Sequence, residues 1–454
     1  MSKPKYLVAV FGGAVAGSEA AFQLTQKNIP CVVFEQTALP YGKIEDGLPK
    51  WHVKLRDKEE EKINTKLNHP LVSYVPNAKL GDTIDFEDVA SKWGFSAILL
   101  ATGAWADRPL PIEGIDQYLN KGLIYQNPFI YWFNHKHEPD YSGPVYPIED
   151  GAIVVGGGLA SLDVVKVLML ETVQEALEKK GHQIDIFTLD RSIAKVLDQL
   201  GLSIDDLGIK GCTLFYRRRM MDMPLSPLPA ETQEQLAKAQ TVRKKICQNF
   251  ISKYLFKMEE NRTPVDKIVE NGRLSGIVLQ ETRIVEERVV PIPGSEKAYK
   301  APLIISSIGS IPEPIPGVPT SGQVFNIEDH VHCKLRGYPH VFALGNAVTG
   351  RGNIIESQKH GKEITQLIID SYLEDPQSAR LEASNSESIK EVREQTQALS
   401  STILKNFSIT EVQFEETMRK VKLQQQKSGY DGNFRRWIET HLPLRLEAML
   451  GVKH

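Results

Sequence analysis

The amino-acid sequence predicts an α/β protein with two doubly wound domains, one inserted into the other, and a C-terminal helical extension. Two stretches carry this prediction. Residues 6–35 read as an apolar strand, a glycine-rich turn, a helix and a second apolar strand that ends in Glu35. Residues 152–180 read as another apolar strand, a turn with Gly156 and Gly158, and a long helix. Strand, turn and helix in this succession are typical of parallel sheets covered by helices.

The first glycine turn predicts a Rossmann-like dinucleotide-binding site. Gly12, Ala14 and Gly17 stand between strand and helix, where small residues let the backbone approach a pyrophosphate at a helix N-terminus. Glu35 lies where an acid that binds an adenosine ribose is expected. One such motif is a weak indication. Two of them in one chain predict two cofactors, a flavin and a nicotinamide.

Loops after the strands of the first domain are candidates for the same site. Residues 39–52 are rich in glycine and proline, include Gly42 and His52, and directly follow the second strand. Ligands of doubly wound folds bind at such strand ends, although a surface loop is the alternative. Thr102 and Gly103 follow the next predicted strand and suit close packing on a cofactor or a structural turn. A histidine such as His52 is, by itself, more typical of a structural or exposed position.

Strand-end residues of the second domain bear on the identity of its nucleotide. Arg217 and Arg218 follow a predicted strand at residues 212–216. A guanidinium group meets a 2′-phosphate through two parallel hydrogen bonds, so these arginines predict NADP. A solvated basic run is the alternative. Asp190 would favour NAD if residues 184–189 form a strand, but that segment can also be read as helical, and we prefer the arginines.

The remaining segments complete the expected domain organisation. Residues 56–67 read as a solvated helix, 72–75 as a strand, 86–93 as a helix, 105–150 as a linker with one short helix, 276–280, 283–290, 303–307 and 341–344 as strands, and 361–373 as a helix. Aromatic residues 125–133 are expected to pack between domains, because no basic groove accompanies them as a base-stacking platform would require. The expected boundaries are 1–108 for the first part of the FAD domain, 109–302 for the NADP domain with its linker, 303–375 for the second part of the FAD domain and 376–454 for the helical extension.

The composition excludes several classes of protein. The chain has 454 residues and a net charge of −3, so no global charge points to nucleic acid or to an anionic membrane. Its four cysteines are far apart and form no CxxC pair, which argues against a zinc or iron–sulfur site and fits a reducing compartment. No signal peptide precedes the first strand and no apolar run is long enough to span a bilayer. We therefore expect a cytoplasmic protein with no metal, no nucleic-acid partner and no membrane association.

Several segments together resemble the adrenodoxin reductase type of ferredoxin–NADP reductase and the related small subunit of glutamate synthase. Residues 129–134 resemble the linker motif Phe-Val-x-Trp-Tyr-Asn of the adrenodoxin reductases. Residues 216–218, followed by Met-Pro and Glu231, resemble the Tyr-Arg-Arg…Met-Pro…Glu run of the glutamate synthase subunit. Residues 42–52 resemble a loop whose histidine lies close to the flavin. Residues 349–354 partly match a segment that contacts flavin and nicotinamide.

The resemblance implies roles for residues of both domains. It implies that the FAD pyrophosphate is held at the first turn, its ribose by Glu35, and the flavin by the loops that follow later strands; the candidates are Gly12, Ala14, Gly17, Glu35, Gly42, Thr102, Gly103, Gly345, Asn346, Gly352, Asn353 and Ile354. For NADP it implies Gly156, Gly158, Ser161, Arg217, Arg218 and Glu231. His52 would lie beside the isoalloxazine and support proton or electron traffic. Ala14 stands where a second glycine is usual, and we expect it to be tolerated.

The implied activity is oxidation of NADPH by an FAD enzyme that passes electrons singly to a protein such as ferredoxin or flavodoxin. The alternative is an NAD(P)H-oxidising electron-input subunit, docked through its C-terminal extension to a larger enzyme. A third reading, a flavoenzyme that uses oxygen or a disulfide, is weaker, because no CxxxxC pair follows the first turn.

Overall fold

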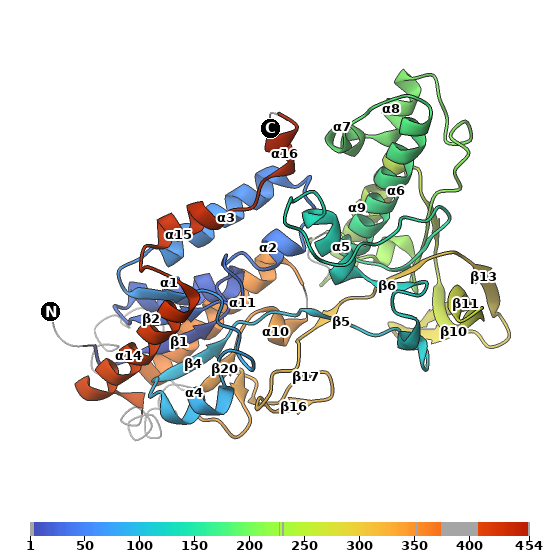
Figure 1. The fold of residues 1–454 in the computed structure, drawn as a ribbon. Coiled ribbons are helices and arrows are strands. Elements are labelled where there is room, and N and C mark those ends of the chain that lie inside the picture. The colour runs from blue at the N-terminus through green and yellow to red at the C-terminus, as the bar shows by residue number, and fades with distance from the viewer. Residues whose placement is uncertain (1–3, 227, 229–230, 351, 374–406, 453–454) are drawn as a thin grey trace. The chain divides into compact units, whose positions relative to one another are not determined.

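A computed structural model describes residues 4–226, 228, 231–350, 352–373 and 407–452. The chain divides into two compact units: unit 1 is residues 1–48, 53–106 and 310–444, and unit 2 is residues 49–52, 107–309 and 445–454. The colours of Figure 1 show that most of unit 2, green to yellow, interrupts unit 1 in the sequence. The predicted α/β class with an inserted second domain is confirmed. Residues 374–406, which include the first part of the expected extension, lie outside the described residues.

Unit 1 is built on a mainly parallel sheet in the order β18-β19-β20-β4-β1-β2-β3. Its strands are β1 (Val8–Phe11), β2 (Cys31–Phe34), β3 (Val72–Val75), β4 (Ala97–Leu100), β18 (Ile327–Asp329), β19 (Lys334–Leu335) and β20 (Val341–Ala343). β20, β4, β1, β2 and β3 pair in parallel, so their carboxyl ends lie at the same edge. These short strands are apolar because helices cover both faces of the sheet and bury both sets of side chains.

Helices of unit 1 pack on both faces of this sheet. They are α1 (Val15–Gln26), α2 (Lys43–Asp46), α3 (Val53–Leu67), α4 (Phe86–Lys92), α10 (Asn346–Thr349), α11 (Ile354–Ile368) with a π-helical turn (Ile369–Leu373), α14 (Glu411–Ser428) and α15 (Phe434–His441). Alternate residues of a strand face opposite sides. Accordingly Val8 and Val10 lie in one core with residues of α1, α3, α11 and α15, whereas Ala9 and Phe11 lie in the other with residues of α4 and α14.

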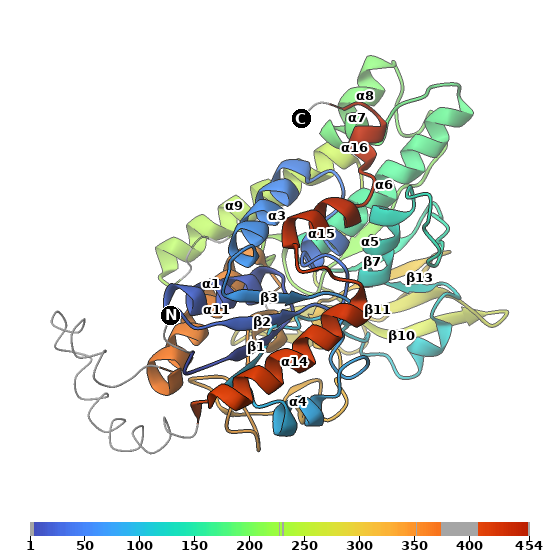
Figure 2. The ribbon, with the colours of Figure 1, turned by 60° about the vertical axis from the view of Figure 1, so that its left-hand side comes forward.

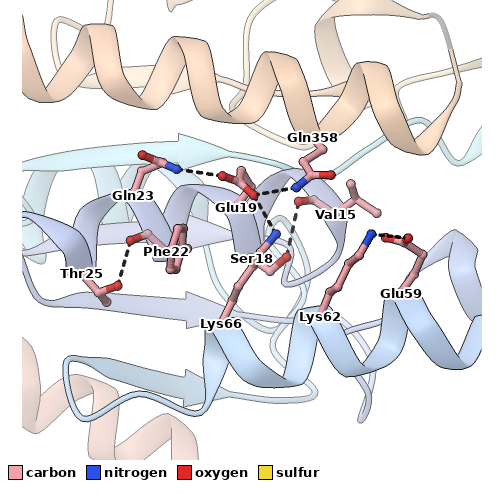
Figure 3. Close-up of polar contacts among 10 residues, drawn as sticks. All are labelled: Val15, Ser18, Glu19, Phe22, Gln23, Thr25, Glu59, Lys62, Lys66 and Gln358. Carbon is pink, nitrogen blue, oxygen red and sulfur yellow. Dashed lines mark hydrogen bonds and ion pairs between the residues drawn. The ribbon is translucent and has the colours of Figure 1, made fainter.

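A buried carboxylate joins three of these helices (Figure 3). Glu19 of α1 is 4% exposed and accepts hydrogen bonds from Lys66 of α3 at 2.6 Å and Gln358 of α11 at 3.1 Å. Gln23 donates a third at 2.8 Å. Burial raises the pKa of a carboxyl group, yet these donors hold the pKa of Glu19 below its usual value. The helix expected to be solvated at residues 56–67 is therefore partly buried, and its Ile63 lies in the core.

The C-terminal helices are an integral part of unit 1. α14 begins with a capping box formed by Thr410 and Gln413, and α15 is capped by Asn433. Val421 of α14 has no exposed surface and belongs to the core that contains Ala9 and Phe11. α14, in red in Figure 2, packs on the sheet of unit 1 and contacts β3. Trp437 of α15 is 7% exposed. The segment expected to be an appended tail thus completes both cores.

Unit 2 contains a second parallel sheet, in the order β6-β14-β7-β8-β9. Its strands are β6 (Leu123–Tyr125), β7 (Ile153–Gly156), β8 (Thr213–Phe215), β9 (Lys257–Glu259) and β14 (Ile304–Ser307); antiparallel strands β10 (Arg262–Glu270), β11 (Arg273–Val285), β12 (Arg288–Pro291) and β13 (Lys297–Lys300) form a separate sheet. The remaining short strands are β5 (Ala106–Asp107), at the boundary of the two units in the sequence, and β15 (Ser310–Ile311), β16 (Thr320–Ser321) and β17 (Val324–Phe325), which belong to unit 1.

Helices of unit 2 differ from the sequence-based expectation in two places. They are α5 (Gln126–His135), α6 (Leu159–Lys179), α7 (Ile186–Arg191), α8 (Ile193–Gln199), α9 (Gln233–Tyr254) and α16 (Leu446–Met449), with 3₁₀ turns η1 (Ile115–Tyr118) and η2 (Met220–Asp222). α7 excludes the strand that would have placed Asp190 at a ribose. The aromatic residues Phe129 and Trp132 of α5 contact each other within unit 2, with ring centroids 5.6 Å apart.

One expected boundary is wrong. β14 was expected to return to the first domain after residue 302, but it pairs in parallel with β6 and β7 of unit 2. Unit 1 therefore resumes at Ser310. An apolar four-residue strand fits the centre of either sheet equally well, so its composition could not decide between them. The extension is not a separate part either, because α14 and α15 belong to unit 1 and α16 to unit 2.

The packing of α14 predicts that the C-terminal helices contribute to the stability of unit 1. Val421→Ala removes two buried methyl groups and should lower the free energy of unfolding by about 2 kcal/mol. Urea titration measures this change. Leu423→Ala, at a 53% exposed position of the same helix, is the matched control and should change stability little. Equal effects of both substitutions would contradict the packing of α14.

Candidate dinucleotide-binding sites

The first turn brings three backbone segments of unit 1 together. A Cβ atom on Gly17 would lie 1.8 Å from the Gly12 carbonyl oxygen, and one on Gly12 would lie 2.4 Å from that of Ala101. Gly12 has a φ of +100°, which L side chains rarely adopt. Glycine is therefore required at both positions, because the start of α1 packs directly on the ends of β1 and β4.

Ala14 fits the turn, as expected. Its backbone has φ −71° and ψ −153°, which any L residue adopts, so no glycine is needed there. No side chain caps the start of α1 at this residue. The first amides of α1 can therefore donate to a pyrophosphate. A Cβ atom on Gly42 would lie 3.0 Å from the Ala14 methyl group, so the loop after β2 packs on this turn.

Glu35 lies beside the same turn. Its Oε2 accepts a hydrogen bond from the Gly13 amide at 2.7 Å, and its Oε1 accepts one from the Thr37 amide at 3.3 Å. The side chain is 4% exposed, and burial raises its pKa to about 7 although the amide donors oppose this. The Thr37 hydroxyl is a further donor, 3.4 Å from Oε1. Each carboxylate oxygen can accept about two hydrogen bonds, so Oε2 can accept one from a ribose hydroxyl group besides that from Gly13. The chemistry of this turn and its acid fits a dinucleotide.

Other predicted residues of unit 1 lie at the same edge of the sheet. Thr102 and Gly103 follow β4, and Gly345 follows β20, so both loops lie beside the first turn at the carboxyl ends of parallel strands. Asn346 begins α10, and its Oδ1 accepts a hydrogen bond from the Gly352 amide at 2.9 Å. These loops form the crevice edge where doubly wound folds bind ligands.

The start of α11 has a structural role that the sequence motif did not indicate. Asn353 caps this helix, since its Oδ1 accepts a hydrogen bond from the Glu356 amide at 2.7 Å, and Ile354 is the first helical residue. The sequence also gave no signal for His360. Its Nδ1 accepts a hydrogen bond from the Gly345 amide at 2.9 Å and so fixes the turn after β20. Burial lowers the pKa of His360, which favours the neutral ring that this bond needs.

The second turn packs in the same way in unit 2. A Cβ atom on Gly156 would lie 2.5 Å from the Ser307 carbonyl oxygen, and one on Gly157 would lie 1.9 Å from the Tyr216 ring. A Cβ atom on Gly158 would meet nothing within 4 Å, so the backbone here borders open space at the start of α6. The Ser161 hydroxyl is buried and donates to the Gly158 carbonyl at 2.7 Å. Ser161 thus holds the turn itself.

The arginines lie directly after β8, as predicted. Arg217 is exposed. Arg218 donates from Nη2 to the Glu287 carbonyl oxygen at 2.7 Å. A hollow of about 470 Å³ lies at this edge of unit 2, lined by Arg219, Met220, Met221, Lys244, Met258 and Glu260. Glu231 is exposed and precedes α9, where its amide donates to Gln235 at 3.1 Å. The strand end is therefore basic and open to solvent.

His52 belongs to unit 2 and has an acidic neighbour. Its Nε2 lies 3.6 Å from Oδ1 of Asp163, on the first turns of α6. The Lys166 ammonium group lies over the ring of the adjacent Trp51, 4.1 Å from its centroid. Lys166 in turn forms an ion pair with Asp190, the residue that was considered for a ribose. Asp163 was not singled out from the sequence, because a single aspartate in a helix gives no signal.

The fold and the two turns define a protein with two dinucleotide-binding units. Among the described residues, no group of His, Cys, Asp and Glu side chains could hold a metal ion. In the same part of the chain, no helix combines the length and the apolar character that a bilayer crossing needs.

Comparison with known proteins agrees with this class. The family described as pyridine nucleotide-disulphide oxidoreductase matches residues 6–199, which include both turns. The chain is 23% identical over 419 residues to the mitochondrial NADPH:adrenodoxin oxidoreductase of Arabidopsis thaliana, covering 82% of this chain and 83% of the relative. It is also 23% identical to the beta subunit of the NADPH-Fe(3+) oxidoreductase of Geobacter sulfurreducens, over 67% of this chain but only 37% of that protein. The predicted resemblance is thus confirmed.

Solved structures show the same fold. Mycobacterium tuberculosis FprA in complex with NADPH superimposes with a TM-score of 0.62 at 19% identity, covering 88% of this chain and 92% of that chain. At this identity the likeness establishes the arrangement of strands and helices. The roles of individual residues rest on the geometry described above.

The burial of Glu35 predicts that the free energy of unfolding of the protein depends on pH. The Glu35 carboxyl group has a pKa of about 7 in the folded protein, above the ordinary 4.5 of a glutamate, so the folded state binds the proton more tightly than the unfolded state does. The contribution of Glu35 to the free energy of unfolding should therefore fall as the pH rises from 4.5 to 7, by about 2–4 kcal/mol. Urea titrations of nucleotide-free protein at pH 5 and pH 8 measure this difference.

Glu35→Gln should remove that fall, because the amide stays neutral and still accepts from Gly13. Glu415→Gln, at an exposed position of α14, is the matched control and should keep the wild-type dependence. Parallel curves for the wild type and Glu35→Gln would contradict the buried position of the carboxyl group.

Proposed function

We propose that this protein is an NADPH-dependent flavoprotein oxidoreductase that holds FAD in unit 1 and NADP in unit 2. The observation that carries the proposal is the contrast between the two strand ends. Glu35 offers a carboxylate to ribose hydroxyl groups and repels a 2′-phosphate. Arg217 offers a guanidinium group to that phosphate. One chain with both arrangements suits one nucleotide of each kind.

The residues of unit 1 would hold FAD along the edge formed by β2, β1, β4 and β20. The turn at Gly12 and Gly17 and the first amides of α1 would bind the pyrophosphate, and Glu35 the adenosine ribose. The loops at Gly42, Thr102–Gly103, Gly345–Asn346 and Gly352–Ile354 would border the flavin. FAD, when bound, supplies the exchange between a two-electron donor and one-electron acceptors.

The residues of unit 2 would orient NADP. The backbone at Gly156 and Gly158 would bind its pyrophosphate, with Ser161 holding the turn, and Arg217 and Arg218 would bind its 2′-phosphate. Glu231 would lie toward the nicotinamide end. His52, whose Nε2 lies 3.6 Å from Oδ1 of Asp163, would support proton or electron traffic.

Electrons would leave the protein singly, to a small carrier such as ferredoxin or flavodoxin. Oxidation of one NADPH gives NADP⁺ and a proton and reduces two one-electron acceptors. The Arabidopsis relative, named for adrenodoxin, supports a protein acceptor. Titration of candidate ferredoxins and flavodoxins against the NADPH-reduced protein tests this part.

An electron-input subunit is the second candidate, because the Geobacter relative is named as the beta subunit of an oxidoreductase. In that case the protein would copurify with a larger enzyme and reduce free carriers poorly. Isolation of the native protein at low ionic strength separates the two candidates.

The phosphate assignment predicts a cofactor-specific defect. Arg217→Ala should raise the KM for NADPH about 5- to 150-fold, since a lost charged hydrogen bond costs about 1–3 kcal/mol. The KM for NADH should not change, because NADH carries no 2′-phosphate. Steady-state oxidation of both nucleotides with an artificial electron acceptor measures the ratio.

Lys179→Ala is the matched control. It also removes one positive charge from unit 2, but at the far end of α6, about 30 Å from the second turn. Equal use of NADPH and NADH before and after Arg217→Ala would refute the assignment. A purified protein without a flavin absorption spectrum, even after addition of FAD, would refute the proposed function as a whole.

A further inference from the structure

The Ala38 carbonyl oxygen, in the loop after β2, accepts two hydrogen bonds from distant side chains. The Tyr74 hydroxyl, on β3, donates at 3.1 Å. The indole N–H of Trp437, on α15, donates at 2.8 Å. These bonds use both lone pairs of the carbonyl oxygen, so they fix the position of the peptide group. Ala38 follows Glu35 by three residues, and the loop is therefore held from outside at this point.

Trp437 is itself held by aromatic packing within unit 1. Its ring meets Tyr430 edge to face, with centroids 5.5 Å apart. Tyr74 meets Tyr430 at 5.8 Å and Phe434 at 5.1 Å, also edge to face. All four side chains are less than 10% exposed, and Gln425 of α14 donates to the Tyr74 carbonyl at 2.8 Å. The C-terminal helices thus place the indole N–H rigidly, as edge-to-face pairs do.

The same loop sets the position of the Glu35 carboxylate. The Thr37 amide donates to Glu35 Oε1 at 3.3 Å, and the Thr37 hydroxyl donates to the Leu39 carbonyl at 2.9 Å. Thr37 is exposed and stands between Glu35 and the peptide group that Trp437 holds. The Thr37 hydroxyl is also 3.4 Å from Oε1 of Glu35. A shift of this loop would therefore move the donors to Oε1, while Oε2 would keep its bond from the Gly13 amide.

We propose that Trp437 is a positioning residue for ribose recognition, through which the C-terminal helix α15 sets the selectivity of Glu35 for a ribose with a free 2′-hydroxyl. The indole N–H holds the Ala38 carbonyl, the next residue back along the chain is Thr37, and the Thr37 amide bonds the carboxylate. This inference rests on the proposed FAD site and adds to it a dependence on a helix about 400 residues away in the sequence, at residues 434–441. Hydrogen-bond partners outside a site orient the groups within it, as is established for the residues that surround metal ligands.

The test compares two competitors of FAD on the full-length protein. ADP and 2′-deoxy-ADP compete with FAD for flavin-depleted protein, read from flavin fluorescence, with saturating NADP⁺ present to occupy unit 2. The wild type should bind ADP about tenfold more tightly than 2′-deoxy-ADP, as expected for one hydrogen bond to a charged acceptor. Trp437→Phe keeps an aromatic ring but removes the N–H. In this variant the ratio of the dissociation constants of 2′-deoxy-ADP and ADP should fall below threefold.

Thr417→Val is the matched control for a purely structural effect. It removes a hydroxyl donor of α14 that bonds the Trp93 carbonyl, away from the Ala38 loop. Its melting temperature should fall while the tenfold ratio stays. Tyr74→Phe removes the other donor to Ala38. It should lower the ratio of dissociation constants, as Trp437→Phe does. This second variant keeps the test decisive if Trp437→Phe folds poorly.

The outcomes separate this inference from the proposed function. If the wild type prefers ADP and both Trp437→Phe and Tyr74→Phe keep the full ratio, Trp437 only stabilises the fold and the inference is wrong. If the wild type does not distinguish the two competitors, Glu35 does not read the 2′-hydroxyl and the inference is equally wrong, although the FAD site stands. If neither competitor displaces FAD because the protein binds no FAD, the proposed function itself fails.

Discussion

The structure depends on a backbone contact that no side chain permits. The Gly17 Cα lies so close to the Gly12 carbonyl that a methyl group there would be 1.8 Å from the oxygen. This contact, with that of Gly12 on Ala101, fixes α1 against the ends of β1 and β4. The amides of α1, the Glu35 carboxylate and the loops after β4 and β20 then converge on one edge of the sheet. The second turn repeats the contact at Gly156, so each unit presents helix amides at a strand edge.

The two units differ mainly in the charge that follows a strand. In unit 1 a buried acid accepts hydrogen bonds from amides of its own turn, and its raised pKa reflects the cost of that burial. In unit 2 arginines at the end of β8 remain near solvent. If both turns bind dinucleotides as proposed, the acid would favour FAD in unit 1 and the arginines would favour NADP in unit 2.

Patterns local in sequence predicted much of the fold and part of the site. The strand, turn and helix of both units follow from alternation of short apolar runs and glycines, which need no distant partner. Errors arose where a segment fits two environments. β14 is an apolar run suited to either sheet, and the helix α7 has the apolar residues of a strand. Asp163, His360 and Trp437 were missed because each acts through a residue more than ten positions away, and no local pattern marks such a pair.

Neighbouring residues along the chain were enough to predict two glycine turns, an acid after the first and arginines after the second, because these features are local. The sheet that each later strand joins and the surroundings of the charged groups became known from the folded chain. The tertiary structure placed β14 in unit 2, built the C-terminal helices into unit 1, and brought Trp437 to the loop after Glu35. Such contacts depend on burial and hydrogen bonds between segments hundreds of residues apart, and the chain order does not encode them in any short motif.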